Sequence, residues 1–267
     1  MPKRSIHGGR HELGQNFLVH RPSITTIINL TAETDGPILE IGAGDGALTA
    51  PLAALGRPVR AIDIDEHRVE RLRRRLPSVD IEPMDAMHVA LDRPVIVGNL
   101  PFHLTTPLMR RLLDARTWAH AIVLTQWEVA RKRAGVGGAT MMTAQAAPWF
   151  TFELHGRVPA HGFVPRPSVD GGVLAIRRRT TPLVRNADRR HYASFVRDVF
   201  TGRGRGVADI LRQRPAGGRE AIQHALARSS TAPNALPRDL TAEQWASLWN
   251  ALRATTPPAR PRRKDNS

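Results

Sequence analysis

Short apolar runs alternate with segments of helical periodicity along most of the chain. The runs have the length of buried strands and are bounded by glycine, proline or charged residues. They predict strands at Ile38–Ile41, Val59–Ile64, Val79–Glu82, Pro94–Val97, Ala121–Thr125 and Gly172–Ile176. Helical spacing predicts helices at Ser23–Leu30, at Ala47–Leu55 and in an arginine-rich segment that ends at Leu76. This alternation indicates an α/β domain with a mainly parallel, Rossmann-like sheet.

The pattern changes after the last predicted strand. Arg177–Pro182 has the composition of a linker, and the residues beyond it show helical spacing with few β-branched runs. A proline-rich basic tail, typical of disorder, follows. We therefore predict a basic N-terminal segment at 1–20, a Rossmann-like domain at 21–180, a helical domain at 181–254 and a disordered tail at 255–267.

The net charge of +15 predicts a polyanionic partner, and nucleic acid is the commonest one. Nearly all of the basic residues are arginines, whose planar guanidinium can bind two phosphate oxygens. No segment approaches the roughly 20 apolar residues that cross a bilayer. There is no cysteine, which excludes disulfides and thiolate metal sites and fits a reducing compartment. We expect a soluble cytoplasmic protein without a metal site.

A glycine-rich turn, Glu40–Gly46, lies between a predicted strand and a predicted helix, where a Rossmann-like sheet binds its nucleotide ligand. Asp63 ends the next strand and Asp85 follows the third, so both can bind polar groups of that ligand. A dinucleotide, S-adenosylmethionine and a plain structural turn all remain compatible with the glycines alone. The carboxylates of Glu40 and Asp45 crowd a pyrophosphate but suit an ammonium and a sulfonium. We therefore favour S-adenosylmethionine, with S-adenosylhomocysteine as product.

A second turn, Asn99-Leu100-Pro101-Phe102, follows the fourth strand and supplies the candidate catalytic residues. The lone pair of an exocyclic adenine amine is delocalised into the ring, so this nitrogen is a poor nucleophile. The Asn99 side-chain oxygen and the Leu100 carbonyl can each accept one N–H bond, which favours a pyramidal nitrogen. Pro101 fixes the backbone, and Phe102 can stack on a base that has left its helix or loop. An ordinary proline turn is the alternative.

Together these motifs resemble one family, the rRNA adenine N6-methyltransferases, which include the Erm macrolide-resistance enzymes and the KsgA/Dim1 small-subunit dimethylases. The resemblance covers about residues 10–180 strongly and the helical part more weakly. Its carriers are Gly14–Leu18, Glu40–Gly46, Asp63, Asp85, Asn99–Phe102 and Phe163–Asp170. It implies a methyltransferase domain followed by a small all-α domain.

The resemblance also implies roles for single residues. Asn16 and Leu18 contact the methionine end of the cofactor, Asp63 holds the ribose, Asp85 holds the adenine, and Asn99 forms the reactive edge. The full set of expected cofactor contacts is Asn16, Leu18, Glu40, Gly42, Gly44, Asp63, Ile64, Asp85, Ala86 and Asn99.

Two residues depart from the common family pattern, and one segment indicates a subgroup. The family often has glutamate in place of Asp63 and tyrosine in place of Phe102. Thr125–Thr140 looks like the actinobacterial Erm form, and KsgA-type proteins usually carry lysine where Trp127 stands. The Erm form implies an adenine in the peptidyl-transferase region of 23S rRNA and resistance to macrolides, lincosamides and streptogramin B.

Candidate RNA contacts are basic or aromatic residues near the predicted site, namely Arg110, Arg111, Arg131, Lys132, Arg133, Phe163 and Arg166. Any one basic pair could instead be solvated surface, as we expect for Arg71 and Arg73–Arg75. Two other functions stay open: a small-subunit rRNA dimethylase, and a nucleic-acid-binding protein that has lost catalysis. The latter should show decay at Asn99–Phe102 or at Asp63, and the sequence shows none. A monomer is expected.

Overall fold

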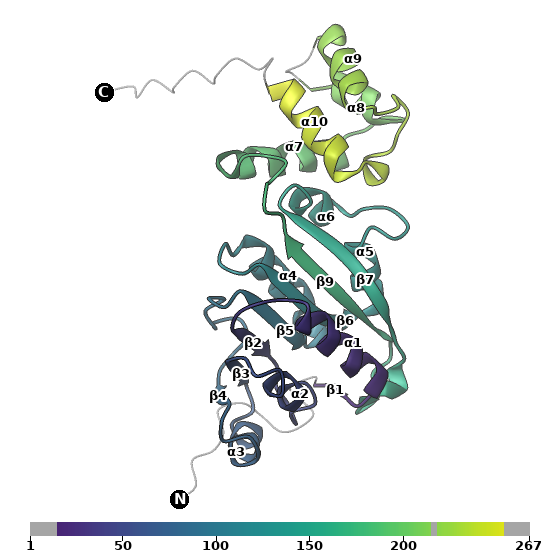
Figure 1. The fold of residues 1–267 in the computed structure, drawn as a ribbon. Coiled ribbons are helices and arrows are strands. Elements are labelled where there is room, and N and C mark those ends of the chain that lie inside the picture. Colours follow the sequence, from purple (N-terminus) through teal and green to yellow (C-terminus); the bar gives the residue numbers. More distant parts are fainter. Residues whose placement is uncertain (1–14, 215–217, 254–267) are drawn as a thin grey trace, which may run out of the picture. The chain divides into compact units, whose positions relative to one another are not determined.

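The computed structural model describes residues 15–214 and 218–253 (Figure 1). The chain divides into two compact units. Unit 1 comprises residues 1–137 and 150–178, and unit 2 comprises residues 138–149 and 179–267. The predicted tail at 255–267 and most of the predicted N-terminal segment at 1–20 lie outside the described residues.

The described part of unit 1 is built on a seven-stranded sheet in the order β4-β3-β2-β5-β6-β9-β7. In that order, the strands are Asp80–Pro83, Val59–Asp63, Ile38–Ile41, Val95–Asn99, His120–Gln126, Gly171–Arg178 and Phe150–Val158. Neighbours from β4 to β6 pair in parallel, whereas β9 is antiparallel to both β6 and β7. The predicted α/β class with a mainly parallel Rossmann-like sheet is therefore confirmed.

The hydrophobic pattern does not reveal β7, although Phe150, Phe152 and Leu154 alternate with polar residues. The register shifts between Leu154 and Gly156, so the alternation breaks in the middle of this edge strand. The predicted linker also begins too early, because its first two residues, Arg177 and Arg178, belong to β9.

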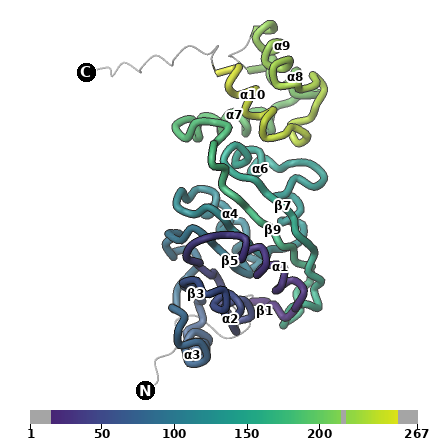
Figure 2. The backbone as a smooth tube through the Cα atoms, in the orientation of Figure 1, coloured from purple at the N-terminus to yellow at the C-terminus, as the bar shows by residue number. Residues whose placement is uncertain are grey.

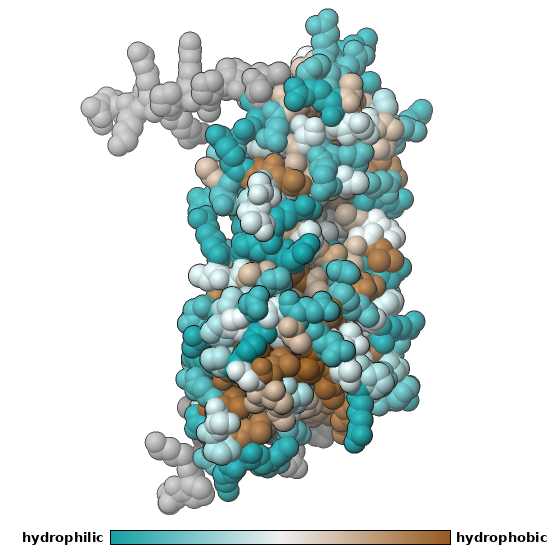
Figure 3. All heavy atoms as spheres, in the orientation of Figure 1, coloured by the Kyte–Doolittle hydropathy of each residue, from teal (hydrophilic) through white to brown (hydrophobic). Residues whose placement is uncertain are grey.

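The helices of unit 1 are α1 Arg21–Ala32, α2 Thr49–Ala53, α3 Glu66–Arg75, the 3₁₀ turn η1 Phe102–Leu104, α4 Thr105–Asp114 and α5 Trp127–Arg133. Among them, α2, α3 and α4 connect neighbouring parallel strands, whereas α1 precedes β2 and α5 follows β6. The start of α3 is fixed by Asp65, whose side chain accepts hydrogen bonds from the backbone N–H groups of His67 and Arg68. Figure 3 shows apolar atoms gathered over α1 and α2, where Ile24, Ile28 and Leu55 pack against the core.

The strand order reverses between β2 and β5, which places their carboxyl ends side by side. In open α/β sheets this reversal is where ligands bind. Ile41 at the end of β2 pairs with Gly98 of β5, and a Cβ at Gly98 would lie 2.4 Å from the Ile41 carbonyl oxygen. Glycine at this position lets the turn after β2 approach Asn99.

A two-stranded sheet closes the same edge. β1 (Phe17–Leu18), labelled in Figure 2, pairs antiparallel with β8 (Phe163–Val164), so two segments that are far apart in the sequence lie side by side. The glycine turn and the Asn99 turn therefore face a third segment that begins near Gln15.

The described elements of unit 2 are helical. They are α6 Met141–Ala146, α7 Arg189–Thr201, α8 Val207–Arg212, α9 Arg219–Arg228 and α10 Ala242–Arg253, with 3₁₀ turns at Asn186–Asp188 and Pro237–Asp239. Aromatic rings form their core, in which Phe195 packs against Trp245 and Trp249. Among the described residues of both units, no helix is long and apolar enough to cross a membrane.

Candidate active site

A pocket opens at the carboxyl edge of the sheet, at the reversal of strand order. It has about 820 Å³ of empty space, a figure that includes open solvent. Its lining comes from the ends of β2, β3, β4 and β5 and from the segment before β1. The lining residues are Gln15, Asn16, Phe17, Ile41, Gly42, Gly44, Ile62, Asp63, Ile64, Met84, Asp85, Ala86 and Asn99 to Leu104.

The carboxylate of Asp63 organises the glycine turn. Asp63 Oδ2 accepts the Gly44 N–H at 2.7 Å, and Oδ1 accepts the Asp65 N–H at 2.9 Å and the Gln15 amide at 3.3 Å. Burial raises the pKa of the Asp63 carboxyl, while the two backbone N–H donors oppose that rise. Because an ionised carboxylate has about four acceptor sites, Asp63 can hold the turn and still accept a ligand hydroxyl.

The Asn99 side chain is held by a single strong contact. Its Nδ2 donates to the Asn16 carbonyl oxygen at 2.6 Å, so the donor end of the amide is engaged and Oδ1 is the end left to accept. Leu100 is buried, and its N–H donates to the Leu124 carbonyl in β6 at 2.9 Å. The turn is therefore anchored on both sides of the sheet edge.

Phe102 lines the pocket, and its ring packs against a second aromatic ring. The ring of Phe163 meets it edge-on, with centroids 5.8 Å apart and planes at 73°. Phe163 itself is only 1% exposed. Phe102 is thus held as a platform on which a planar group can stack.

The loop after β4 carries the third wall. Asp85 Oδ1 accepts the Met87 N–H at 2.8 Å, which closes a local turn. The guanidinium of Arg111, from α4, donates to the Ala86 carbonyl at 3.2 Å and also to the Val89 carbonyl. Arg111 therefore fixes the loop that presents Asp85 to the pocket.

The profile of the ribosomal RNA adenine dimethylase family matches residues 6–253. The chain belongs to that family. Mycinamicin-resistance protein MyrB of Micromonospora griseorubida is 49% identical over 250 residues, covering 92% of this chain and 80% of that protein. An rRNA adenine N-6-methyltransferase of Corynebacterium diphtheriae is 47% identical over 240 residues, covering 87% of this chain and 94% of that protein. The crystal structure of the 23S rRNA methyltransferase ErmE matches with a TM-score of 0.79 at 33% identity, covering 89% of this chain and all of that one.

The resemblance inferred from the motifs is thereby confirmed: this is a member of an rRNA adenine N6-methyltransferase family. The structure brings most of the predicted cofactor-binding and catalytic residues together in one pocket. They are Asn16, Gly42, Gly44, Asp63, Ile64, Asp85, Ala86, Asn99, Leu100, Pro101 and Phe102.

Two predicted cofactor contacts, Leu18 and Glu40, are not in the pocket lining, and neither is the glycine-turn acid Asp45. Leu18 is 4% exposed and packs in the core. The Asp45 carboxylate pairs with Arg68 and Arg71 of α3. Glu40 is 1% exposed and is not part of the lining.

Glu40 is a buried acid within β2. Burial raises the pKa of its carboxyl to about 7; the Thr49 hydroxyl opposes the rise and the nearby Asp63 carboxylate adds to it. Among the described residues, Glu40 Oε2 has no hydrogen-bond partner. A neutral carboxylic acid is the form that this environment favours.

The predicted RNA contacts differ in their exposure and in the residues that they contact. Arg110, Lys132 and Arg166 are exposed, whereas Arg111 and Phe163 are engaged in holding the site, as described above. Arg131 pairs with Glu128 at 3.3 Å. Burial and the neighbouring Arg110 charge lower the pKa of the Arg133 guanidinium, so two cations gather where α4 and α5 approach.

The motifs gave no separate role to several lining residues, namely Gln15, Phe17, Met84 and His103. Gln15 and Phe17 flank Asn16 in the first motif, and Met84 and His103 are direct neighbours of Asp85 and Phe102. Adjacency to a predicted contact was the only available signal for them.

Proposed function

We propose that this protein transfers a methyl group from S-adenosylmethionine to the exocyclic N6 of an adenine in the peptidyl-transferase region of 23S rRNA. The modification would confer resistance to macrolides, lincosamides and streptogramin B. The observation that carries the chemistry is the Asn99 amide, whose donor end is bound by the Asn16 carbonyl inside the pocket. The similarity to MyrB, a mycinamicin-resistance protein, and to ErmE, a 23S rRNA methyltransferase, supports the choice of RNA and of the resistance.

The chemistry of the lining fits S-adenosylmethionine. Asp63 offers acceptors for ribose hydroxyls, Asp85 for the adenine amine, and the Gln15–Asn16 segment offers amide groups to the amino-acid end. When bound, the cofactor supplies an electrophilic methyl group.

The protein's own contribution is positioning. Asn99 Oδ1 and the Leu100 carbonyl would accept the two N–H bonds of the target amine, so that its lone pair is turned out of the ring plane. Phe102 would stack on the target base and hold it at the pocket mouth. No strong general base is required, because the amine becomes acidic once it has been methylated and can then lose its proton to water.

The RNA would approach over the exposed cations Arg110, Lys132 and Arg166. Since phosphate neutralisation releases counterions, the affinity should fall steeply as salt is added. All residues of the proposed site come from one chain, so a monomer suffices. The proposed reaction belongs to the cytoplasm, where ribosomes are made and used.

The testing experiment is transfer of labelled methyl from S-adenosylmethionine to purified 23S and 16S rRNA, followed by mapping of the modified base. We expect label at one adenine of the peptidyl-transferase loop, and none with Asn99→Ala. Label on 16S rRNA alone would assign the protein to the small-subunit dimethylases instead. Absence of label on both RNAs, from wild-type protein that binds the cofactor, would contradict the proposed substrate.

A further inference from the structure

One wall of the pocket is a short segment that makes few regular backbone pairs of its own. We call residues Gln15–Leu18 the strap. Its side chains and carbonyls reach both cofactor turns: the Gln15 amide donates to Asp63, and the Asn16 carbonyl accepts from Asn99. The strap therefore bridges the glycine turn and the Asn-Leu-Pro-Phe turn.

The ring of Phe17 covers the glycine turn from the strap side. Gly44 has a φ of +53°, and a Cβ there would lie 2.9 Å from Phe17 Cδ1. Glycine satisfies both the backbone conformation and the close approach of the ring. The position of Phe17 thus decides how the strap sits against the turn that lines the pocket.

Arg68, in the first turn of α3, holds Phe17 from the other side. The guanidinium carbon lies 3.9 Å from the centroid of the Phe17 ring. The Arg68 side chain is only 15% exposed, so water competes weakly for this cation–π contact.

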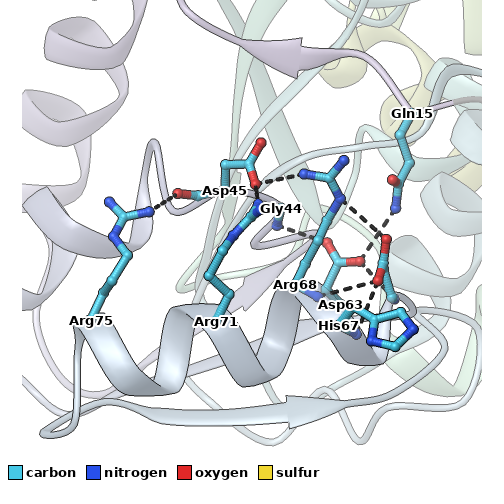
Figure 4. Close-up of polar contacts among 9 residues, drawn as sticks. Gln15, Gly44, Asp45, Asp63, His67, Arg68, Arg71 and Arg75 are labelled. Atoms are coloured by element: carbon cyan, nitrogen blue, oxygen red, sulfur yellow. Dashed lines mark hydrogen bonds and ion pairs between the residues drawn. The ribbon is translucent and has the colours of Figure 1, made fainter. Parts of the chain in front are cut away.

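The same guanidinium is fixed by two carboxylates (Figure 4). Arg68 Nη1 donates to Asp45 Oδ1 at 2.5 Å, and Nε donates to Asp65 Oδ2 at 3.2 Å. Asp45 belongs to the glycine turn, and Asp65 caps α3. Arg71 also pairs with Asp45, but its side chain is 56% exposed. Arg68 is thus the member of this cluster that joins α3, the glycine turn and the strap.

We propose that Arg68 is a positioning residue for cofactor binding, which clamps Phe17 and Asp45 together and so holds the strap as a preformed wall of the pocket. The inference rests on the proposed function, because the molecule that benefits is S-adenosylmethionine. A wall that is already ordered lowers the entropic cost of binding. Loss of the clamp should therefore weaken the cofactor complex and leave the chemistry of the Asn99 turn intact.

The test compares Arg68→Met with Arg71→Met by calorimetric titration with S-adenosylmethionine and by steady-state methylation of 23S rRNA. For Arg68→Met we expect the cofactor Kd and KM to rise about tenfold, equivalent to about 1.4 kcal/mol. The kcat at saturating cofactor should stay within about twofold, as expected when binding alone is affected. Arg71→Met is the matched control, because it loses an Asp45 partner without touching Phe17, and its Kd should stay near that of wild type.

A double-mutant cycle tests whether Arg68 acts through the ring. Phe17→Leu keeps apolar bulk but removes the π face, so adding Arg68→Met to it should cost little further affinity. Additive losses would overturn the clamp, and so would equal losses in Arg68→Met and Arg71→Met. If Arg68→Met does not fold, Arg68→Lys decides: it keeps the charge but not the planar fork, and an unchanged Kd in that variant would also overturn the inference. Wild-type protein that binds no S-adenosylmethionine would contradict the proposed function itself.

Discussion

The side-chain amide of Asn99 donates to the backbone carbonyl of Asn16 at 2.6 Å, across the pocket from the glycine turn. This bond orients the amide, because the oxygen of an amide points away from the partner that its nitrogen binds. It also means that the strap and the proposed catalytic turn position each other. This hydrogen bond thus links the strap to the turn that begins at Asn99.

Removal of the Asn99 side chain should impair catalysis far more than cofactor binding. We expect Asn99→Ala to lower kcat by about a hundredfold or more, in the range seen when one positioned polar group of a transition state is deleted. Transfer of labelled methyl measures kcat, and calorimetry measures cofactor affinity, which should fall by a much smaller factor through the lost contact with Asn16. Asn99→Asp keeps an acceptor but loses the donor to the Asn16 carbonyl, so its kcat should lie between that of wild type and that of Asn99→Ala. Wild-type turnover in a folded Asn99→Ala protein would refute the assigned role.

The aromatic platform should act on the RNA and not on the cofactor. Base–aromatic stacking contributes about 1–3 kcal/mol, so Phe102→Ala should lower kcat/KM for RNA by roughly ten- to a hundredfold. Phe102→Tyr preserves the ring face and should stay near wild type. A loss confined to cofactor KM would show that Phe102 serves only as pocket wall.

Two adjacent arginines of α4 should have different effects. Arg110 is exposed, and Arg110→Met should weaken RNA binding and lower the slope of log K against log salt by about one. Arg111 holds the Asp85 loop through two carbonyls, so Arg111→Met should raise the cofactor Kd instead. Filter binding over a salt series and calorimetry separate the two. Identical phenotypes would mean that the loop contact has no bearing on the pocket.

The buried acid Glu40 should make stability depend on pH. Its folded-state pKa of about 7 lies above the ordinary value of 4.5, so the folded state holds a proton that the unfolded state releases between these two pH values. The free energy of unfolding should then decrease as pH rises from about 4.5 to 7, by up to roughly 3 kcal/mol from this group. The free energy of unfolding, measured with urea at pH 5 and pH 8, should differ less between the two pH values in Glu40→Gln than in wild type. The exposed control Glu33→Gln should behave as wild type; an unchanged slope in Glu40→Gln would assign the pH dependence to other groups.

The strands and the two turns of the site could be predicted because each depends on local sequence. Ile38–Ile41 is a short run in which Glu40 is the one polar residue, and it is β2 in the structure without change of bounds. Asp63 and Asn99 lie at the ends of two further runs of this kind and are the last residues of β3 and β5, so their place at the sheet edge followed from the alternation of strands and helices. The family resemblance then gave those positions their chemistry.

The rest depends on contacts between distant residues, which a linear pattern does not contain. Asp45 has the charge expected of a cofactor ligand, but α3 brings two arginines to it. Arg111 has the charge expected of a phosphate contact, but two carbonyls of the Asp85 loop take its donors. In each case the sequence identifies the charged group, but only the tertiary structure shows which residue it contacts.

The pairing of β1 with β8 has a consequence for the order of assembly. Phe17 pairs with Val164, a residue that leaves the ribosome long after the strap has been made. Contacts between such distant segments form late, since the loop between them must first be closed. A nascent chain that ends before β8 therefore lacks the strand that anchors the strap. The pocket wall formed by the strap is therefore complete only after β8 has been made, and we expect a chain that ends before β8 to bind S-adenosylmethionine less well than the full chain does.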